Sequence, residues 1–192
     1  ERTGIRTCAW FYRGARMITA NKEIKTPNDL AGLKFRLPSM PLRIAVFEAL
    51  GATPTVVEFS ELYMALKTGT VDAQENPAET IYSYKYYEAQ KYLILSRHIY
   101  TMARFGASAV WMDTLSQEDQ DLIMNAWADA RNEITEKYQD PDETYIQKCE
   151  DEGMTVITPE NEKFIELAKP AVEKWAAENG AEDILTLINN TQ

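Results

Sequence analysis

The change from a helical to an alternating hydrophobic pattern is clearest in residues 59–77, FSELYMALKTGTVDAQENP. Ser60 is placed to cap a short helix whose apolar positions share one face, and Gly69 is placed to end it. From residue 71 to residue 76, apolar and polar positions alternate, as they do in a strand with one buried face. The polar side chains of this strand share its other face: Asp72, Gln74 and Asn76.

Asn76 stands at the end of this predicted strand and at the start of the next predicted helix. Pro77 suits the first helical position and Glu79 suits the third, so a role as helix cap explains Asn76 completely. Asn76 also lies at the carboxyl end of a strand, which is where open α/β sheets bind ligands. Both interpretations stay open.

The first part of the chain predicts extended stretches separated by turns. Residues 5–12 and 15–20 predict two extended segments that meet at a bend at Gly14. Residues 26–32 predict one helical turn with a threonine cap, a first-turn proline and a glycine stop.

The pattern LKFRL in residues 33–37 predicts a strand in which Arg36 leaves the sheet on the face opposite the apolar row. Residues 42–51 then predict a helix that ends at a glycine, with Ser39 as the simplest cap. A guanidinium at this strand end matches a carboxylate with two parallel hydrogen bonds, and a nearby helix N-terminus favours an anion. A solvent-facing strand arginine is the alternative.

The remaining pattern alternates strands and helices before it becomes mainly helical. The expected strands are 55–57, 92–95, 105–112 and 154–157, and the expected helices are 77–90, a long one from Ser116, a restart at Pro141, 159–178 and 184–188. The alternation predicts an α/β fold with a largely parallel sheet.

The charge distribution favours a small anion over a nucleic acid as the ligand. The net charge of -10 argues against a nucleic-acid partner. Nine of the 20 basic residues but three of the 30 acidic residues precede residue 48, which leaves 11 against 27 in the rest. Such a basic segment serves an anion or is only a solvated face.

The motif content favours binding over catalysis. His98 is the one histidine, and no GxSxG, HExxH, phosphate-loop or GxGxxG motif occurs. Cys8 and Cys149 lie far apart without metal-ligand spacing, so we expect small buried side chains, with a disulfide as the alternative. We expect no catalytic residue, metal or cofactor.

The chain also contains no apolar run long enough to span a membrane, and residues 1–7 lack the apolar core of a signal peptide. If the protein is exported, we expect that residue 1 is not its true start.

Three segments together resemble the solute-binding proteins of tripartite ATP-independent periplasmic (TRAP) transporters: TPNDLAGLKFRLP, ALGATPTVVEFSELYMALKTGTVDAQENP and KYYEAQKYL. The resemblance implies a periplasmic two-lobed clamp that closes on a small organic acid and delivers it to a membrane permease. It implies ligand-binding roles for residues that sequence pattern alone leaves ambiguous: Arg36 as the main carboxylate partner, with Arg16, Asn76, Phe59 and Ser39 near the ligand. Without the resemblance, Phe59 is explained as packing on Met64.

The resemblance implies an α/β fold of the type II periplasmic-binding-protein class, here without much of the first lobe. Residues 14–101 and 141–192 are then expected to form the second lobe. Residues 1–13 and 102–140 are expected to belong to the first lobe and to include a long helix that bridges the lobes. The alternatives are a carboxylate-handling α/β enzyme and a truncated domain that binds nothing.

Overall fold

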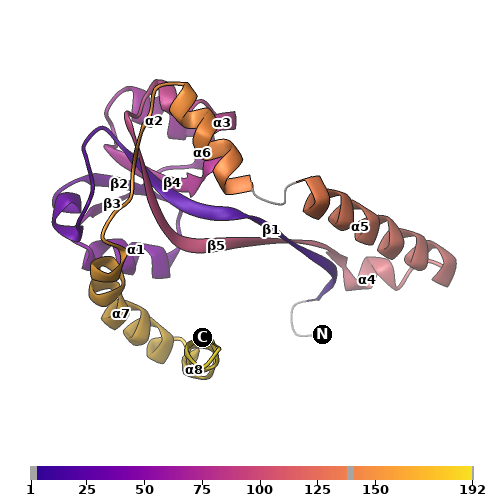
Figure 1. Cartoon of the computed structure of the whole chain (residues 1–192). Helices are drawn as coiled ribbons and strands as arrows, with labels where there is room; N and C mark the ends of the chain where they lie inside the picture. Colours follow the sequence, from indigo (N-terminus) through magenta and orange to yellow (C-terminus); the bar gives the residue numbers. More distant parts are fainter. Residues whose placement is uncertain (1–3, 138–140, 192) are drawn as a thin grey trace.

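The computed structural model describes residues 4–137 and 141–191, in which a curved sheet is flanked by helices (Figure 1). The strands are β1 (Ile5–Ala20), β2 (Lys34–Leu37), β3 (Thr53–Val56), β4 (Ala73–Pro77), β5 (Tyr92–Ser108) and β6 (Thr155–Ile157). Their order is β3-β2-β4-β1-β5-β6. β1 is antiparallel to β4 and β5, whereas the β2/β3, β2/β4 and β5/β6 pairs are parallel. The α/β prediction is confirmed, and the largely parallel sheet has one exception, β1.

Helices cover both faces of this sheet (Figure 1). On one face α1 (Pro41–Ala49) packs against α7 (Asn161–Glu178), and on the other face α3 (Ala78–Ser83) packs against α6 (Pro141–Asp151). The remaining elements are α2 (Leu62–Lys67), α4 (Ala109–Met112), α5 (Gln117–Lys137), α8 (Glu182–Asn189) and the 3-10 turns η1 (Pro27–Leu30), η2 (Phe59–Glu61) and η3 (Tyr86–Glu88).

Each face of the sheet has its own buried core. Ile18 and Phe35 join Phe47 of α1 in one cluster, while Met17 and Leu93 join residues of α2, α3 and α6 in the other. Because side chains alternate along a strand, the neighbours Met17 and Ile18 point into opposite cores.

The strands β1 and β5 extend beyond the other strands as a two-stranded ribbon (Figure 1). Phe11 and Phe105 pack at 5.4 Å on the ribbon face that α5 covers, and Phe105 stacks on Trp127 of α5 at 6.3 Å. In the described residues, no strand pairs with the outer edges of the ribbon. Residues 5–20 and 92–108 are thus single long strands, where the sequence predicted two shorter segments each.

The expected bend at Gly14 is an irregularity inside the continuous strand β1. Gly14 has a φ of +107°, and the register of β1 with β5 shifts between Tyr12 and Ala15. The amide of Ala15 donates to Asp142 at 3.0 Å, and the Tyr12 hydroxyl donates to the same carboxylate at 2.8 Å. A Cβ atom at Gly14 would lie 2.8 Å from Asp142 Oδ1, so the first turn of α6 fits tightly against the bulge.

Two predicted helix starts are confirmed by their capping contacts. Thr26 and Asp29 form a capping box at η1. Ser116 accepts the amide proton of Asp119 at 3.1 Å at the start of α5. Both caps lie in loops, where no neighbouring strand competes for the backbone.

Three other predicted caps are wrong. Ser39 precedes the actual N-cap, Met40, and Ser60 lies inside η2 instead of before it. Asn76 remains in β4, and Pro77 is the N-cap of α3. In each case strand pairing or a tight turn determines the residue at which the extended conformation ends. The type of side chain at that residue does not reveal this position.

Two predicted elements change character before they end. The helix expected over 77–90 breaks at Lys85, whose φ is +56°, and η3 follows. The last part of the strand expected over 105–112 is the helix α4. The helices and the strand expected after Pro141 are present as α6, β6, α7 and α8.

No helix of the described residues is long and apolar enough to cross a membrane. Cys149 is a free, buried cysteine, and burial raises the pKa of its thiol to about 12. The side chain of Cys8 lies outside the described part of the chain.

Candidate functional site

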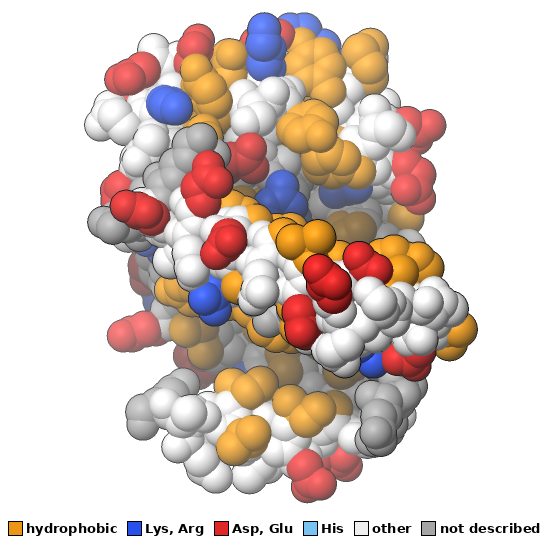
Figure 2. All heavy atoms as spheres, turned by 90° about the vertical axis from the view of Figure 1, so that its right-hand side faces the viewer, with side chains coloured by type: hydrophobic (Ala, Val, Ile, Leu, Met, Phe, Trp, Pro, Cys, Tyr) orange, Lys and Arg blue, Asp and Glu red, His pale blue; other side chains and the backbone are white. Residues whose placement is uncertain are grey.

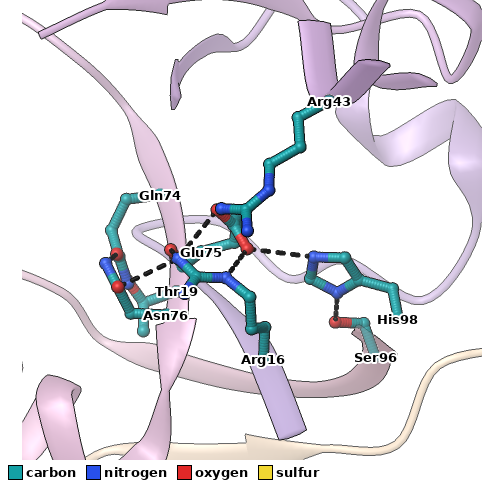
Figure 3. A network of polar contacts seen from close by, with 8 residues as sticks. All are labelled: Arg16, Thr19, Arg43, Gln74, Glu75, Asn76, Ser96 and His98. Carbon is teal, nitrogen blue, oxygen red and sulfur yellow. Dashed lines mark hydrogen bonds and ion pairs between the residues drawn. The ribbon is translucent and has the colours of Figure 1, made fainter. Parts of the chain in front are cut away.

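A completely buried carboxylate, that of Glu75 in β4, lies at the centre of a polar cluster (Figure 3). Arg16 of β1 bonds both carboxylate oxygens: Nη2 donates to Oε1 at 2.9 Å, and Nε donates to Oε2. Arg43 of α1 donates from Nη1 to Oε1 at 3.1 Å. His98 of β5 places Nε2 3.2 Å from Oε2. Three strands and a helix therefore meet at one buried charge.

The histidine of this cluster is held at both ring nitrogens. Its Nδ1 lies 2.8 Å from the hydroxyl of Ser96. A neutral ring that carries its proton on Nε2 satisfies both contacts, because it donates to Glu75 and accepts from Ser96. The ring also forms a T-shaped contact with Phe47, with 5.6 Å between the ring centroids.

The pKa of Glu75 reflects two opposing effects. Burial raises it, but hydrogen bonds from His98 and Arg16, together with the charge of Arg16, bring it down to about 2. The carboxylate is therefore ionised at neutral pH, and Arg16 has an obligatory anionic partner.

A row of amide and hydroxyl groups continues from Arg16 along β4 (Figure 3). Asn76 Oδ1 accepts from Arg16 Nη2 at 2.9 Å, and Asn76 Nδ2 donates to Gln74 at 2.6 Å. Gln74 donates to Thr19 at 3.0 Å. The chain thus places Arg16 and Asn76 in direct contact, and the Asn76 side chain is engaged here instead of capping a helix.

Arg36 lies beside this row, because it is the register partner of Gln74 across β2 and β4. Its side chain is almost completely buried, at 3% exposure. Its Nε donates to the carbonyl of Val57 at 2.8 Å, and no carboxylate of the described residues lies within ion-pair distance of it. Burial lowers the pKa of Arg36, but a guanidinium stays charged at neutral pH. Arg36 is thus a buried cation with unused donors.

The other two predicted site residues lie more openly. Phe59 is 38% exposed and meets the ring of Tyr84 edge-on at 4.8 Å. Ser39 is exposed just beyond the end of β2. Tyr86 is fully buried, and its hydroxyl has no hydrogen-bond partner among the described residues. Burial raises the pKa of this hydroxyl to about 12, although the positive charge of Arg36 acts to lower it.

Sequence reasoning missed Glu75, Arg43 and His98. One signal for Glu75 is that it shares the strand face of the apolar Ala73, which is an unusual place for a carboxylate. Arg43 lies one helical turn before Phe47, the buried residue of α1, and two turns before the buried C-cap residue Leu50, so all three share one face. No local pattern marked His98.

Other surface features lie away from this cluster. One shallow depression is lined by Asn21, Tyr87 and Lys91 with their neighbours, and another by Thr26, Pro27 and Lys163 with theirs. The described residues contain no group of histidine, cysteine and acidic side chains that could hold a metal ion. In the space-filling view, basic side chains lie at the back of a recess above the helix that crosses the front (Figure 2).

Residues 1–179 match the family described as bacterial extracellular solute-binding protein, family 7. The 2,3-diketo-L-gulonate-binding periplasmic protein YiaO of Escherichia coli is 34% identical over 82% of this chain and 48% of its own length. A TRAP periplasmic solute-binding protein of Roseobacter denitrificans, solved with L-galactonate, has a TM-score of 0.84 and 33% identity, covering 96% of this chain and 62% of that one. One of Sulfitobacter, solved with β-D-galacturonate, has a TM-score of 0.93 and 27% identity, covering 98% of this chain and 64% of that one.

The chain spans about half the length of the curated relatives that it matches, with 53%, 48% and 53% of three of them. Residues 1–179, which match the family, include the whole polar cluster around Glu75.

Proposed function

The chain belongs to the bacterial extracellular solute-binding proteins of family 7, and we propose that it forms part of a periplasmic protein that captures a small organic acid for a TRAP transporter. The acid is then handed to membrane permease subunits, and no bond of the acid is made or broken. The names of the relatives support this class of ligand, since those cited above bind sugar acids or keto acids.

The observation that carries the proposal is the state of Arg36. A buried cation without an anionic partner is costly, and binding of a carboxylate removes that cost. Because the guanidinium of Arg36 already uses Nε on Val57, its terminal nitrogens are the donors that remain for a carboxylate. Arg36 therefore takes the ligand carboxylate.

Arg16 and Asn76 complete the proposed carboxylate site. Arg16 is committed to Glu75, so it contributes mainly the field of its charge and the orientation of Asn76. The partly exposed ring of Phe59 provides an apolar wall, and the exposed hydroxyl of Ser39 provides a polar group at the end of β2. Closure of two lobes over these groups excludes water and strengthens each polar contact.

We propose that residues 14–101 and 141–192 form the second lobe and that residues 1–13 and 102–140 belong to the first. Residues 1–3, 138–140 and 192 of these ranges lie outside the described residues. The support is that the sheet core and its helices fall in the first set, whereas the outer ribbon and α5 fall in the second.

The test is a calorimetric titration of the full-length protein with a panel of organic acids, in native form and as Arg36→Lys. Lysine keeps the charge but loses the planar fork, so we expect affinity for the best acid to fall at least tenfold, about 1.4 kcal/mol. Arg13→Lys is the matched control, because Arg13 is half exposed and lies 3.7 Å from the Glu79 carboxylate. Unchanged affinity in Arg36→Lys would refute Arg36 as the anchor.

If no acid of the panel binds or raises the unfolding temperature of the native protein, the proposed function itself is wrong, because a ligand of the folded state must stabilise it.

A further inference from the structure

Arg43 belongs to the buried cluster around Glu75 but, unlike Arg16, has no role in the proposed function and was not predicted from the sequence. It stands in the first turn of α1 and approaches Glu75 from the helix side, whereas Arg16 approaches from the strand side (Figure 3). Its side chain is 19% exposed, compared with 11% for Arg16 and 0% for Glu75. Arg43 is therefore the member of this trio that a ligand reaches most easily.

Glu75 does not need Arg43 in order to be satisfied. Arg16 bonds both carboxylate oxygens and His98 bonds one of them. Arg43 contributes a single bond of 3.1 Å from Nη1, and its other donors have no partner among the described residues. A guanidinium has five N–H donors, so four remain for another acceptor.

The charges around the site do not balance. Arg16, Arg36 and Arg43 bring three positive charges, and Glu75 brings one negative charge, which leaves an excess of two among the described residues. Glu58 is the other carboxylate that acts on Arg36, and it is exposed and contributes least. Burial disfavours the charged forms of both Arg36 and Arg43, so an anion is favoured at each.

The packing of α1 holds Arg43 in this position. Phe47, one turn later on the same helix face, is buried and stacks on Phe35 at 4.1 Å. Because this contact fixes the rotation of α1, the base of the Arg43 side chain is already directed at the cluster before any ligand arrives.

We infer that Arg43 is a further ligand-binding residue and that it makes the site favour an acid with two negative charges over a singly charged acid of the same shape. The inference rests on the proposed function. Arg36 holds the first acid group, and Arg43 donates its unused N–H groups to the second while Arg16 and His98 keep Glu75 bonded.

The test compares diacids with their half-amides, which have the same length and one charge less: succinate with succinamate, and glutarate with glutaramate. Calorimetry on the full-length native protein is expected to give at least tenfold tighter binding of the better diacid than of its half-amide. In Arg43→Gln the preference is expected to fall below threefold, through a loss of diacid affinity alone. Arg43→Lys is expected to restore part of it, because a charge without a fork still attracts the second acid group.

A purely structural ion pair predicts a different result. In that case Arg43→Gln lowers the unfolding temperature of the ligand-free protein and weakens the diacid and the half-amide equally. Arg13→Gln controls for the loss of one positive charge at an exposed site. Equal binding of the two acids by the native protein, or an unchanged preference in Arg43→Gln, would overturn the inference and leave the proposed function intact. The proposed function fails separately, if no organic acid binds.

Discussion

The carboxylate of Glu75 has no exposed surface and is bonded by three side chains from three different elements. Burial of such an ion pair costs desolvation, and the removal of one partner leaves the others as uncompensated charges. Protonation of Glu75 at low pH therefore weakens all three of these contacts at once.

The pH dependence of stability follows from the lowered pKa of Glu75. The pKa falls from the ordinary 4.5 to about 2 on folding, so its contribution is complete above pH 4.5 and is lost as the pH falls toward 2. At 1.36 kcal/mol per pKa unit, this contribution is about 3 kcal/mol. We expect urea unfolding to show that the stability difference between the native chain and Glu75→Gln shrinks by about this amount between pH 5 and pH 2.

The control for this experiment is Glu23→Gln, which removes an exposed carboxylate paired with Lys25. Its stability difference from the native chain is expected to stay within about 0.5 kcal/mol at all pH values. A constant difference between native protein and Glu75→Gln over the same range would show that Glu75 is not the titrating group.

The sequence allowed prediction of the candidate side chains that follow simple alternation, and it failed where a charge lies on an apolar face. The directions of Arg36 and Asn76 follow from the strand period, and the contact of Asn76 with Arg16 agrees with the grouping that the family resemblance implied. Glu75 was missed because a strand pattern assigns its position to the core, where a carboxylate is tolerated only with partners from distant elements.

At the scale of elements, the bulge in β1 and the first turn of α6 act as one unit. Gly14 takes a φ of +107°, which L-residues avoid, and faces Asp142 at close range. Asp142 in turn accepts hydrogen bonds from Ala15 and Tyr12 on either side of the glycine. The position of α6 against the sheet therefore depends on a residue without a side chain.

We expect Gly14→Ala to lower the free energy of unfolding by about 2 to 4 kcal/mol, because it adds a steric clash to backbone strain. Gly69→Ala is the matched control: its φ is +72°, but an added Cβ would meet no atom within 4 Å. It is expected to cost about 1 kcal/mol, through strain alone. Chemical denaturation measures both values.

If Gly14→Ala costs no more than Gly69→Ala, the contact with Asp142 does not determine the position of α6. A smaller effect of Gly14→Ala in an Asp142→Ala background would support the contact directly, because the two substitutions would then be coupled.

Element boundaries were predictable only where local chemistry decides them. The loop caps at Thr26 and Ser116 obey side-chain preference. Local side-chain preference does not determine the lengths of β1 and β5, because the two strands pair with each other over nearly their whole length. The sequence around Gly14 alone predicts a break in β1. Tertiary pairing thus overrode local propensity in the longest strands.

At the scale of the whole molecule, the fold separates into a covered sheet and an uncovered ribbon. Both faces of the central sheet are packed, whereas β5 beyond residue 97 alternates between half-buried positions beneath α5 and exposed ones on the other side. Tyr100 is 66% exposed and Met102 is 53% exposed on that side. Groups of exposed hydrophobic side chains are visible on this end of the molecule (Figure 2).

The overall class was predictable because alternation of strands and helices and a long family resemblance both point to it. The proposed division into lobes rests on the resemblance alone, since no composition change marks residue 101 or residue 141. Long-range pairing of β1 with β4 and β5 has no local signature, which is why the single antiparallel strand was not foreseen.

The ribbon has a consequence for handling this 192-residue chain in solution. Its two outer edges carry backbone donors and acceptors without a strand partner in the described residues, beside an exposed apolar face. Such an edge is a template on which the strand of another molecule adds. We expect light scattering to show association that increases with concentration, and we expect Met102→Lys to reduce it. Met64→Lys, at an equally exposed site on α2, is expected to leave the association unchanged. An equal effect of the two substitutions would indicate nonspecific hydrophobic association instead of strand addition.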